Sequence, residues 1–85
     1  MEFEQVWDNI KRHENEEFVT KRGLVLTYEL FGDSIKPSRT DYFISKSDFK
    51  KAMKLMPLKN IKEISSICRG PSYIYAILMD KRICG

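Results

Sequence analysis

A Gly-Pro break followed by an almost uninterrupted apolar run constrains the fold of this chain more than any other stretch. The run extends from Tyr73 to Met79 and ends in Asp-Lys-Arg. A segment of this composition must be buried, and a chain of 85 residues has room for only one hydrophobic core. We therefore expect a single domain, residues 1–85, that packs around this segment.

The conformation of the run has two interpretations. Pro71 directly after Gly70 suits the first position of a helix, where the missing N–H costs nothing. Three residues at helical spacing would then form the buried stripe: Ile74, Ile77 and Leu78. The alternative is a central strand, because aromatic and β-branched residues also dominate this run and periodicity does not resolve short apolar segments. We predict a helix over 71–79 and keep the strand over 72–79 as the alternative.

The first half of the chain predicts one helix and three strands. Phe3, Val6, Trp7 and Ile10 recur at helical spacing and predict an amphipathic helix over residues 2–14 with Trp7 buried. Residues 18–20 and 24–31 predict a hairpin that turns at Gly23, and residues 24–30 alternate as a strand with one buried side does. A turn at 32–34 leads to a third, irregular strand. Pro37 interrupts its first half and restricts pairing there to an edge, and residues 40–44 complete it.

The second half predicts helices. Ser45 with Asp48 three residues later predicts a capped helix that Pro57 ends. Asn60 would cap a further helix, in which Ile61, Ile64 and Cys68 repeat at helical spacing. The fold class is therefore α+β. We expect a small three-stranded antiparallel sheet with an N-terminal helix and two or three C-terminal helices on one face, in the order α-β-β-β-α-α-α.

Charge is distributed unevenly along the chain. Residues 1–17 contain six acidic and two basic residues, a net charge of −4. Because the whole chain carries +3, the remaining residues carry +7. A basic body attached to an acidic first helix indicates an acidic partner such as DNA or RNA. The candidate nucleic-acid-binding residues are Lys21, Arg22, Lys36, Arg39, Lys46, Lys50, Lys54, Arg69 and Tyr75. A solvated lysine face and tyrosines packed in the core are the plainer interpretation of the same residues.

Catalytic and metal-binding patterns are missing from the sequence. The four glycines are isolated, so none forms a phosphate loop, and the single His13 has no nucleophile or acid beside it. Cys68 and Cys84 lack the neighbouring ligands that a metal site needs, and we expect free thiols. The sequence therefore predicts a protein without catalytic residues, cofactor or metal. With no apolar stretch of membrane-spanning length and an acidic start, we expect a cytoplasmic protein of bacterial, archaeal or phage origin.

Two resemblances add to these expectations. Residues 60–83, "NIKEISSICRG" followed by "PSYIYAILMDKRI", resemble a helix-turn-helix, which implies that the second helix enters the major groove of DNA. The segments "WDNI", "FVTKRGLVLTYEL", "SKSDFKKAM" and "RGPSYIYAILMDKRI" resemble a small single-domain bacterial family. That second likeness covers most of the chain and implies no activity.

The sequence leaves two hypotheses of function. The first is a non-catalytic nucleic-acid-binding domain that uses the lysines of the helix after Ser45 and the 69–75 junction. The second is a protein interaction module, such as a small regulator or inhibitor of a larger enzyme. A cluster of basic residues on one face would favour the first, and an exposed apolar patch would favour the second.

Overall fold

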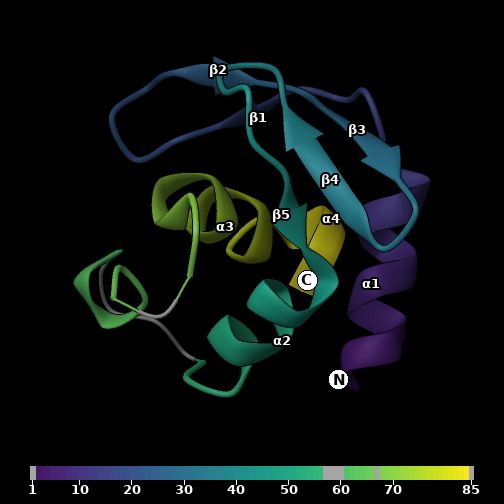
Figure 1. The fold of residues 1–85 in the computed structure, drawn as a ribbon, viewed down its shortest axis with the longest axis vertical. Coiled ribbons are helices and arrows are strands. Elements are labelled where there is room, and N and C mark those ends of the chain that lie inside the picture. The colour runs from purple at the N-terminus through teal and green to yellow at the C-terminus, as the bar shows by residue number, and fades with distance from the viewer. Residues whose placement is uncertain (1, 57–60, 67, 85) are drawn as a thin grey trace.

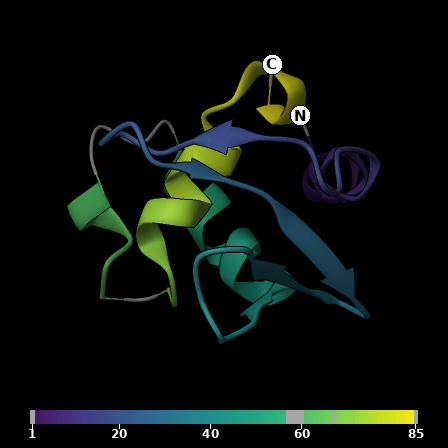
Figure 2. The same cartoon turned by 90° about the horizontal axis from the view of Figure 1, so that it is seen from above.

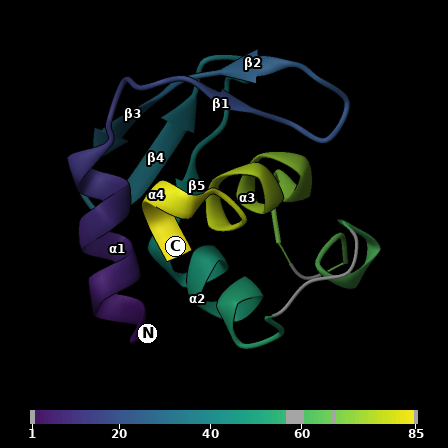
Figure 3. The ribbon, with the colours of Figure 1, turned by 180° about the vertical axis from the view of Figure 1, so that it is seen from behind.

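The computed structural model describes residues 2–56, 61–66 and 68–84, and these form the predicted α+β fold. Its elements in chain order are α1 (Phe3–Arg12), β1 (Phe18–Val19), β2 (Val25–Leu26), β3 (Tyr28–Phe31), β4 (Ser34–Pro37), β5 (Ile44–Ser45), α2 (Lys46–Met53), the 3-10 helix η1 (Ile61–Glu63), α3 (Pro71–Leu78) and α4 (Lys81–Cys84). Most of the strands lie on one side of the molecule and the helices on the other (Figures 1 and 3). Figure 2 places α1 at the opposite end of the molecule from the β1–β2 loop.

The predicted three-stranded antiparallel sheet is present, but it consists of β3, β4 and β5, while β1 and β2 pair as a separate two-stranded sheet. The strand predicted over 24–31 therefore breaks at Thr27, where the chain changes partner. Thr27 donates its N–H to the Ser38 hydroxyl at 3.0 Å and accepts the Ser38 N–H at 2.8 Å. The third predicted strand also divides into two. Pro37 ends β4 opposite Tyr28, beyond the point where β5 runs alongside.

The outer edge of β3 is bonded within the molecule. The N–H of Leu30 donates to the Glu14 carboxylate at 2.8 Å, and the carbonyl of Tyr28 accepts the N–H of Asn15 at 2.9 Å. Asn15 reaches this position with a left-handed backbone, φ 67°. The segment after α1 thus covers the exposed side of the strand.

Helix α1 is shorter than the predicted 2–14, but its buried face is the predicted one. Trp7 is 2% exposed and its ring lies 5.9 Å from that of Phe49 in α2. Near the end of α1, the hydroxyl of Tyr28 donates to the carbonyl of Ile10 at 2.6 Å. A carbonyl in the last turn of a helix lacks a partner within the helix, so Tyr28 supplies one from the sheet.

Helix α2 begins as predicted, because the Ser45 hydroxyl accepts the N–H of Asp48 at 3.2 Å. It ends at Met53, before Pro57, which lies outside the described residues, as does Asn60. The helix predicted from Asn60 onward is wrong in extent: within the described residues it is the single 3-10 turn η1. Ile64 and Cys68 are buried from turns instead.

Residues 71–78 form the helix α3, so the predicted helix is confirmed and the alternative strand over 72–79 is wrong. Gly70 precedes it with φ +64° and Pro71 occupies its first turn. The helical spacing extends through "PSYIYAILMDKRI", but α3 stops at Leu78. Asp80 then accepts the N–H of Arg82 at 2.8 Å and starts α4.

The core lies between the sheets and the helices and takes residues from nearly every element. Its buried members are Val6, Trp7, Ile10, Phe18, Leu26, Tyr28, Ile35, Ile44, Phe49, Ala52, Ile64, Cys68, Ile74, Ala76, Ile77, Leu78 and Ile83. Arg82 links α4 to the segment before β1 at the rim of this core. Its guanidinium bonds Asp80 at 2.9 Å, Glu16 at 3.1 Å and the Glu17 carbonyl at 2.7 Å, and lies 3.9 Å from the centre of the Phe18 ring.

Candidate functional site

A tight turn at the tip of the β1–β2 hairpin presents Lys21 and Arg22. Thr20 holds the turn at its base with three bonds: its carbonyl accepts the Gly23 N–H at 2.9 Å, its N–H donates to the Leu24 carbonyl at 2.8 Å, and its hydroxyl accepts the Leu24 N–H at 3.1 Å. Gly23, at φ +85°, supplies the left-handed residue that such a loop needs. The backbone under both cations is therefore fixed in the free protein.

A hollow of about 390 Å³ lies between this turn, η1 and the start of α3. Its described lining residues are Thr20, Lys21, Arg22, Leu24, Ile61, Ser72 and Tyr73, none of which is acidic. Figures 1 and 3 show that the β1–β2 loop, η1 and α3 share the side of the molecule away from α1. The ammonium of Lys21 also lies 5.8 Å from the centre of the Tyr75 ring. The hollow thus combines two cations with an aromatic wall and keeps the acidic helix at a distance.

A second aromatic and cationic pair lies beside the hollow. The Arg69 guanidinium is 5.1 Å from the centre of the Tyr42 ring. A Cβ on Gly70 would lie 3.1 Å from the Tyr42 hydroxyl and 3.2 Å from the Tyr73 ring, so only glycine lets the two tyrosines come this close. Burial, followed by the neighbouring Tyr73, raises the pKa of Tyr42.

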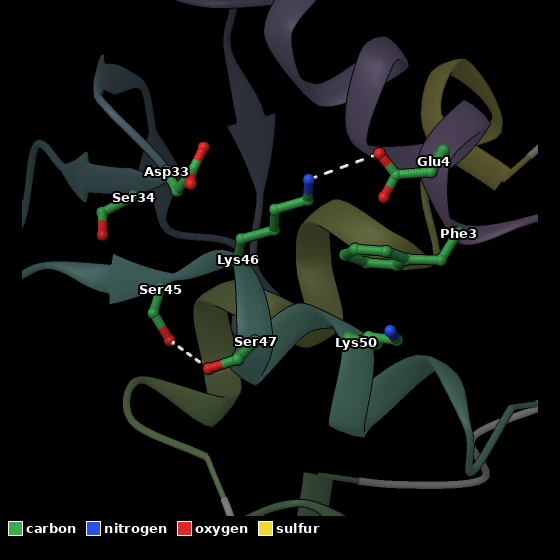
Figure 4. Close-up of a pocket in the computed structure, with 8 residues that line it drawn as sticks. All are labelled: Phe3, Glu4, Asp33, Ser34, Ser45, Lys46, Ser47 and Lys50. Carbon is green, nitrogen blue, oxygen red and sulfur yellow. Dashed lines mark hydrogen bonds and ion pairs between the residues drawn. The ribbon is translucent and has the colours of Figure 1, made fainter.

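The lysines of α2 belong to a different region, which Figure 4 shows in close-up. Lys46 reaches across to Glu4 of α1 at 3.3 Å and lies 5.9 Å from the centre of the Trp7 ring. Lys46 and Lys50 line a hollow of about 460 Å³ together with Glu4 and Asp33, so its charges balance. Lys50 and Lys54 are exposed. Glu4 of the acidic helix therefore partly neutralises Lys46, the first of the α2 lysines.

The remaining candidates lie in the sheet and its connections, and they line neither hollow. Lys36 lies opposite Glu29 in the register of β3 and β4. Arg39 donates from Nε to the Val25 carbonyl of β2 at 2.7 Å. The structure thus groups the predicted residues as Lys21, Arg22 and Tyr75 near the hairpin tip, Arg69 beside them, and the α2 lysines elsewhere.

The sequence analysis did not select Thr20, Ser72 or Tyr73 as a binding residue. The signal for Thr20 is its place three residues before Gly23, where a side-chain oxygen closes a turn. Ser72 gives only a weak signal, since it follows Pro71 at the start of a helix. Their approach to Lys21 depends on the fold.

Reactive groups are not assembled into a site in the part of the chain that the structure describes. Both cysteines are free, and burial raises the pKa of the Cys68 and Cys84 thiols, which keeps them protonated and poorly nucleophilic. His13 bonds Glu16 at 2.9 Å on the surface. Among the described residues, no cluster of His, Cys, Asp and Glu side chains has the arrangement of a metal site. No helix among them has the length and apolar character to cross a membrane.

Comparison with protein-family models, with curated proteins and with solved structures finds no match to this chain. The helix-turn-helix resemblance therefore stays a prediction. In the described residues, α3 occupies the place of its second helix, and η1 is a single turn where it implies a first helix.

Proposed function

We propose that this protein is a non-catalytic nucleic-acid-binding domain of the cytoplasm. The observation that carries the proposal is the meeting of Lys21 and Arg22 with the 69–75 segment around one hollow that has no acidic side chain among its described lining residues. The two parts are about fifty positions apart in the sequence, and the fold brings their basic and aromatic side chains together. Cations bind phosphates and aromatic rings stack on bases, so the hollow offers both components of nucleic-acid recognition.

The α2 lysines have a secondary role in this proposal. Lys50 and Lys54 are exposed and extend the positive potential that attracts a polyanion, whereas Lys46 is engaged with Glu4. Each phosphate that a Lys or Arg side chain neutralises releases counterions, so the log of the affinity falls linearly with the log of the salt concentration.

Fluorescence anisotropy with labelled oligonucleotides over a salt series tests the proposal. We expect binding at low salt that weakens with a slope of about −0.7 to −0.9 for each phosphate contact. The Lys50→Glu/Lys54→Glu variant should bind several-fold more weakly while unfolding at nearly the same temperature, because exposed charges contribute little to folding. Absence of binding at micromolar protein in low salt would refute the proposal.

One observation favours the second hypothesis, a protein interaction module. Phe31 and Phe43 are 49% and 48% exposed, and their rings meet edge to face with centroids 5.4 Å apart. Two large aromatic side chains together on the surface are typical of a contact with another protein. If nucleic acid does not bind, the Phe31→Ser/Phe43→Ser variant should lose a partner that the wild-type protein retains, with the fold unchanged by circular dichroism.

A further inference from the structure

Helix α3 presents no fully exposed residue. Four of its eight residues are buried, and the other four, Pro71, Ser72, Tyr73 and Tyr75, are half-buried. A helix that reads the major groove directs a row of exposed side chains at the base edges in that groove. In this fold the β1–β2 loop and the helix pack together, so α3 lacks such a row.

The hollow beside α3 has a shape suited to a different form of nucleic acid. Its volume of about 390 Å³ falls within the range of roughly 300–1,000 Å³ over which pockets hold small ligands. Bases paired within a duplex are stacked in the helix and do not enter a recess, whereas a base of a single strand turns outward freely. A recess of this size accommodates one nucleotide.

The walls of the hollow match the parts of a nucleotide. Tyr73 and Ile61 supply an aromatic and an apolar surface for the base, and Lys21 and Arg22 supply cations for the phosphate. Neither cation forms an ion pair with a described acidic side chain, unlike Lys46 with Glu4. The bonds of Thr20 fix the backbone that carries them, which lowers the entropic cost of binding.

The adjacent Arg69 and Tyr42 extend the same chemistry past Gly70. The two tyrosines approach each other there, and each has a cation nearby: Lys21 and Arg22 line the hollow with Tyr73, and Arg69 covers Tyr42. A row of alternating aromatic and cationic groups is the arrangement with which proteins follow a single strand.

We propose that the hollow binds one nucleotide of a single-stranded polynucleotide, with its base against Tyr73 and its phosphate between Lys21 and Arg22. This inference rests on the proposed nucleic-acid-binding function and names the form of the ligand and its site. The neighbouring nucleotide lies against Tyr42 and Arg69. DNA and RNA share the base and phosphate that the site recognises.

Anisotropy titrations of the full chain with short single-stranded DNA, single-stranded RNA and a duplex of the same sequence test the proposal. Either single strand should bind at least tenfold more tightly than the duplex, and the tighter of the two identifies the ligand. Lys21→Ala/Arg22→Ala should lower the affinity for the strand about tenfold or more. It should also make the salt slope shallower by about 0.7, which corresponds to the one phosphate that the two cations share.

The matched control removes the same number of cations elsewhere. Lys50→Ala/Lys54→Ala on α2 should change the affinity less than the hairpin double variant does. Tyr73→Leu keeps an apolar side chain but removes the ring, and should lower the affinity by about tenfold. Tyr73→Phe keeps the ring and should bind as the wild type does, which separates stacking from folding. In ¹⁵N spectra of the wild-type protein, a bound strand should shift the amide signals of residues 20–24 and of Gly70, Ser72 and Tyr73 most.

Each failure has a separate meaning. Equal or tighter binding of the duplex overturns the single-strand inference and leaves the nucleic-acid function standing. A larger loss in the α2 variant than in the hairpin variant, or amide shifts confined to α2, overturns the site. Binding of neither strand nor duplex refutes the proposed function itself.

Discussion

Replacement of Tyr28 by phenylalanine removes one hydroxyl from the core and little else. The side chain is 1% exposed, and its ring lies 5.5 Å from that of Phe18, a contact that phenylalanine preserves. The hydroxyl is the partner of the Ile10 carbonyl at 2.6 Å. In a longer helix the Glu14 N–H would bond that carbonyl, but here it turns to Lys11 at 3.4 Å. The variant therefore leaves a buried carbonyl without its partner.

The cost follows from the desolvation of that carbonyl. A buried acceptor left without a donor destabilises a protein by about 1–3 kcal/mol. In a domain of this size each kcal/mol lowers Tm by about 4–8 °C, so a loss of about 2 kcal/mol corresponds to about 8–16 °C. Urea unfolding should show a lower midpoint with an unchanged slope, because the surface exposed on unfolding stays the same.

Tyr75→Phe is the matched control. Tyr75 is half-buried, and its hydroxyl bonds no other residue among those described, so its removal should change stability by less than about 0.5 kcal/mol. Equal stability of Tyr28→Phe and the wild type would contradict the assignment of Tyr28 as the cap of α1. A slope that changes with the midpoint would instead indicate a change in the unfolded or native state.

Three further changes probe the packing and charges of the fold. Trp7→Ala should lower the free energy of unfolding by about 3–5 kcal/mol, because the ring is 2% exposed, and near-wild-type thermal unfolding would place α1 outside the core. Gly70→Ala should lower Tm more than Gly32→Ala. Both glycines have positive φ, but a Cβ at Gly70 would lie 2.8 Å from the core residue Ile44, whereas a Cβ at Gly32 would meet no atom within 4 Å. Equal effects of the two substitutions on Tm would show that the contact with Ile44 does not matter. Hydrogen bonds from Arg82 lower the pKa of Asp80. The stability gained from this pair is present above the ordinary carboxyl pKa of 3.8 and is lost as the pH falls through the lower pKa of the folded state. Arg82→Ala should therefore lose less stability than the wild type does on acidification. Urea unfolding at neutral and acidic pH measures this difference.

Local signals in the sequence predicted much of the helical part of the fold. The cap at Ser45 and the Gly70–Pro71 break each act within a few residues, so their patterns specify the helix starts directly. The spacing of Ile64 and Cys68 predicted a helix that is not there, because irregular segments bury both side chains without one. The break at Thr27 was also missed: the alternation of polarity continues through it, and the partner that divides the strand, Ser38, is eleven residues away.

The candidate site depends on contacts that no local pattern reveals. The basic character of Lys21 and Arg22 was evident, but not their position beside Tyr73, which packing between distant elements determines. For Lys46, the contact that the sequence did not reveal makes the residue a weaker candidate. The sequence grouped it with Lys50 as a nucleic-acid-binding candidate on one helix, whereas the approach of α1 gives it Glu4 as an ion-pair partner.

The bonds that cover the edge of β3 have a consequence for how this protein behaves in a crowded solution. A strand with free edge groups is a template on which another chain adds its own strand, and such addition leads to aggregates. Glu14 and Asn15 occupy two of those groups, one through a carboxylate that a second chain would have to displace. We expect Glu14→Ala to scatter more light as the concentration rises, while a surface change such as Asp8→Ala should leave the protein dispersed. The turn after α1 thus opposes the edge-to-edge pairing of strands that leads to fibrous self-association.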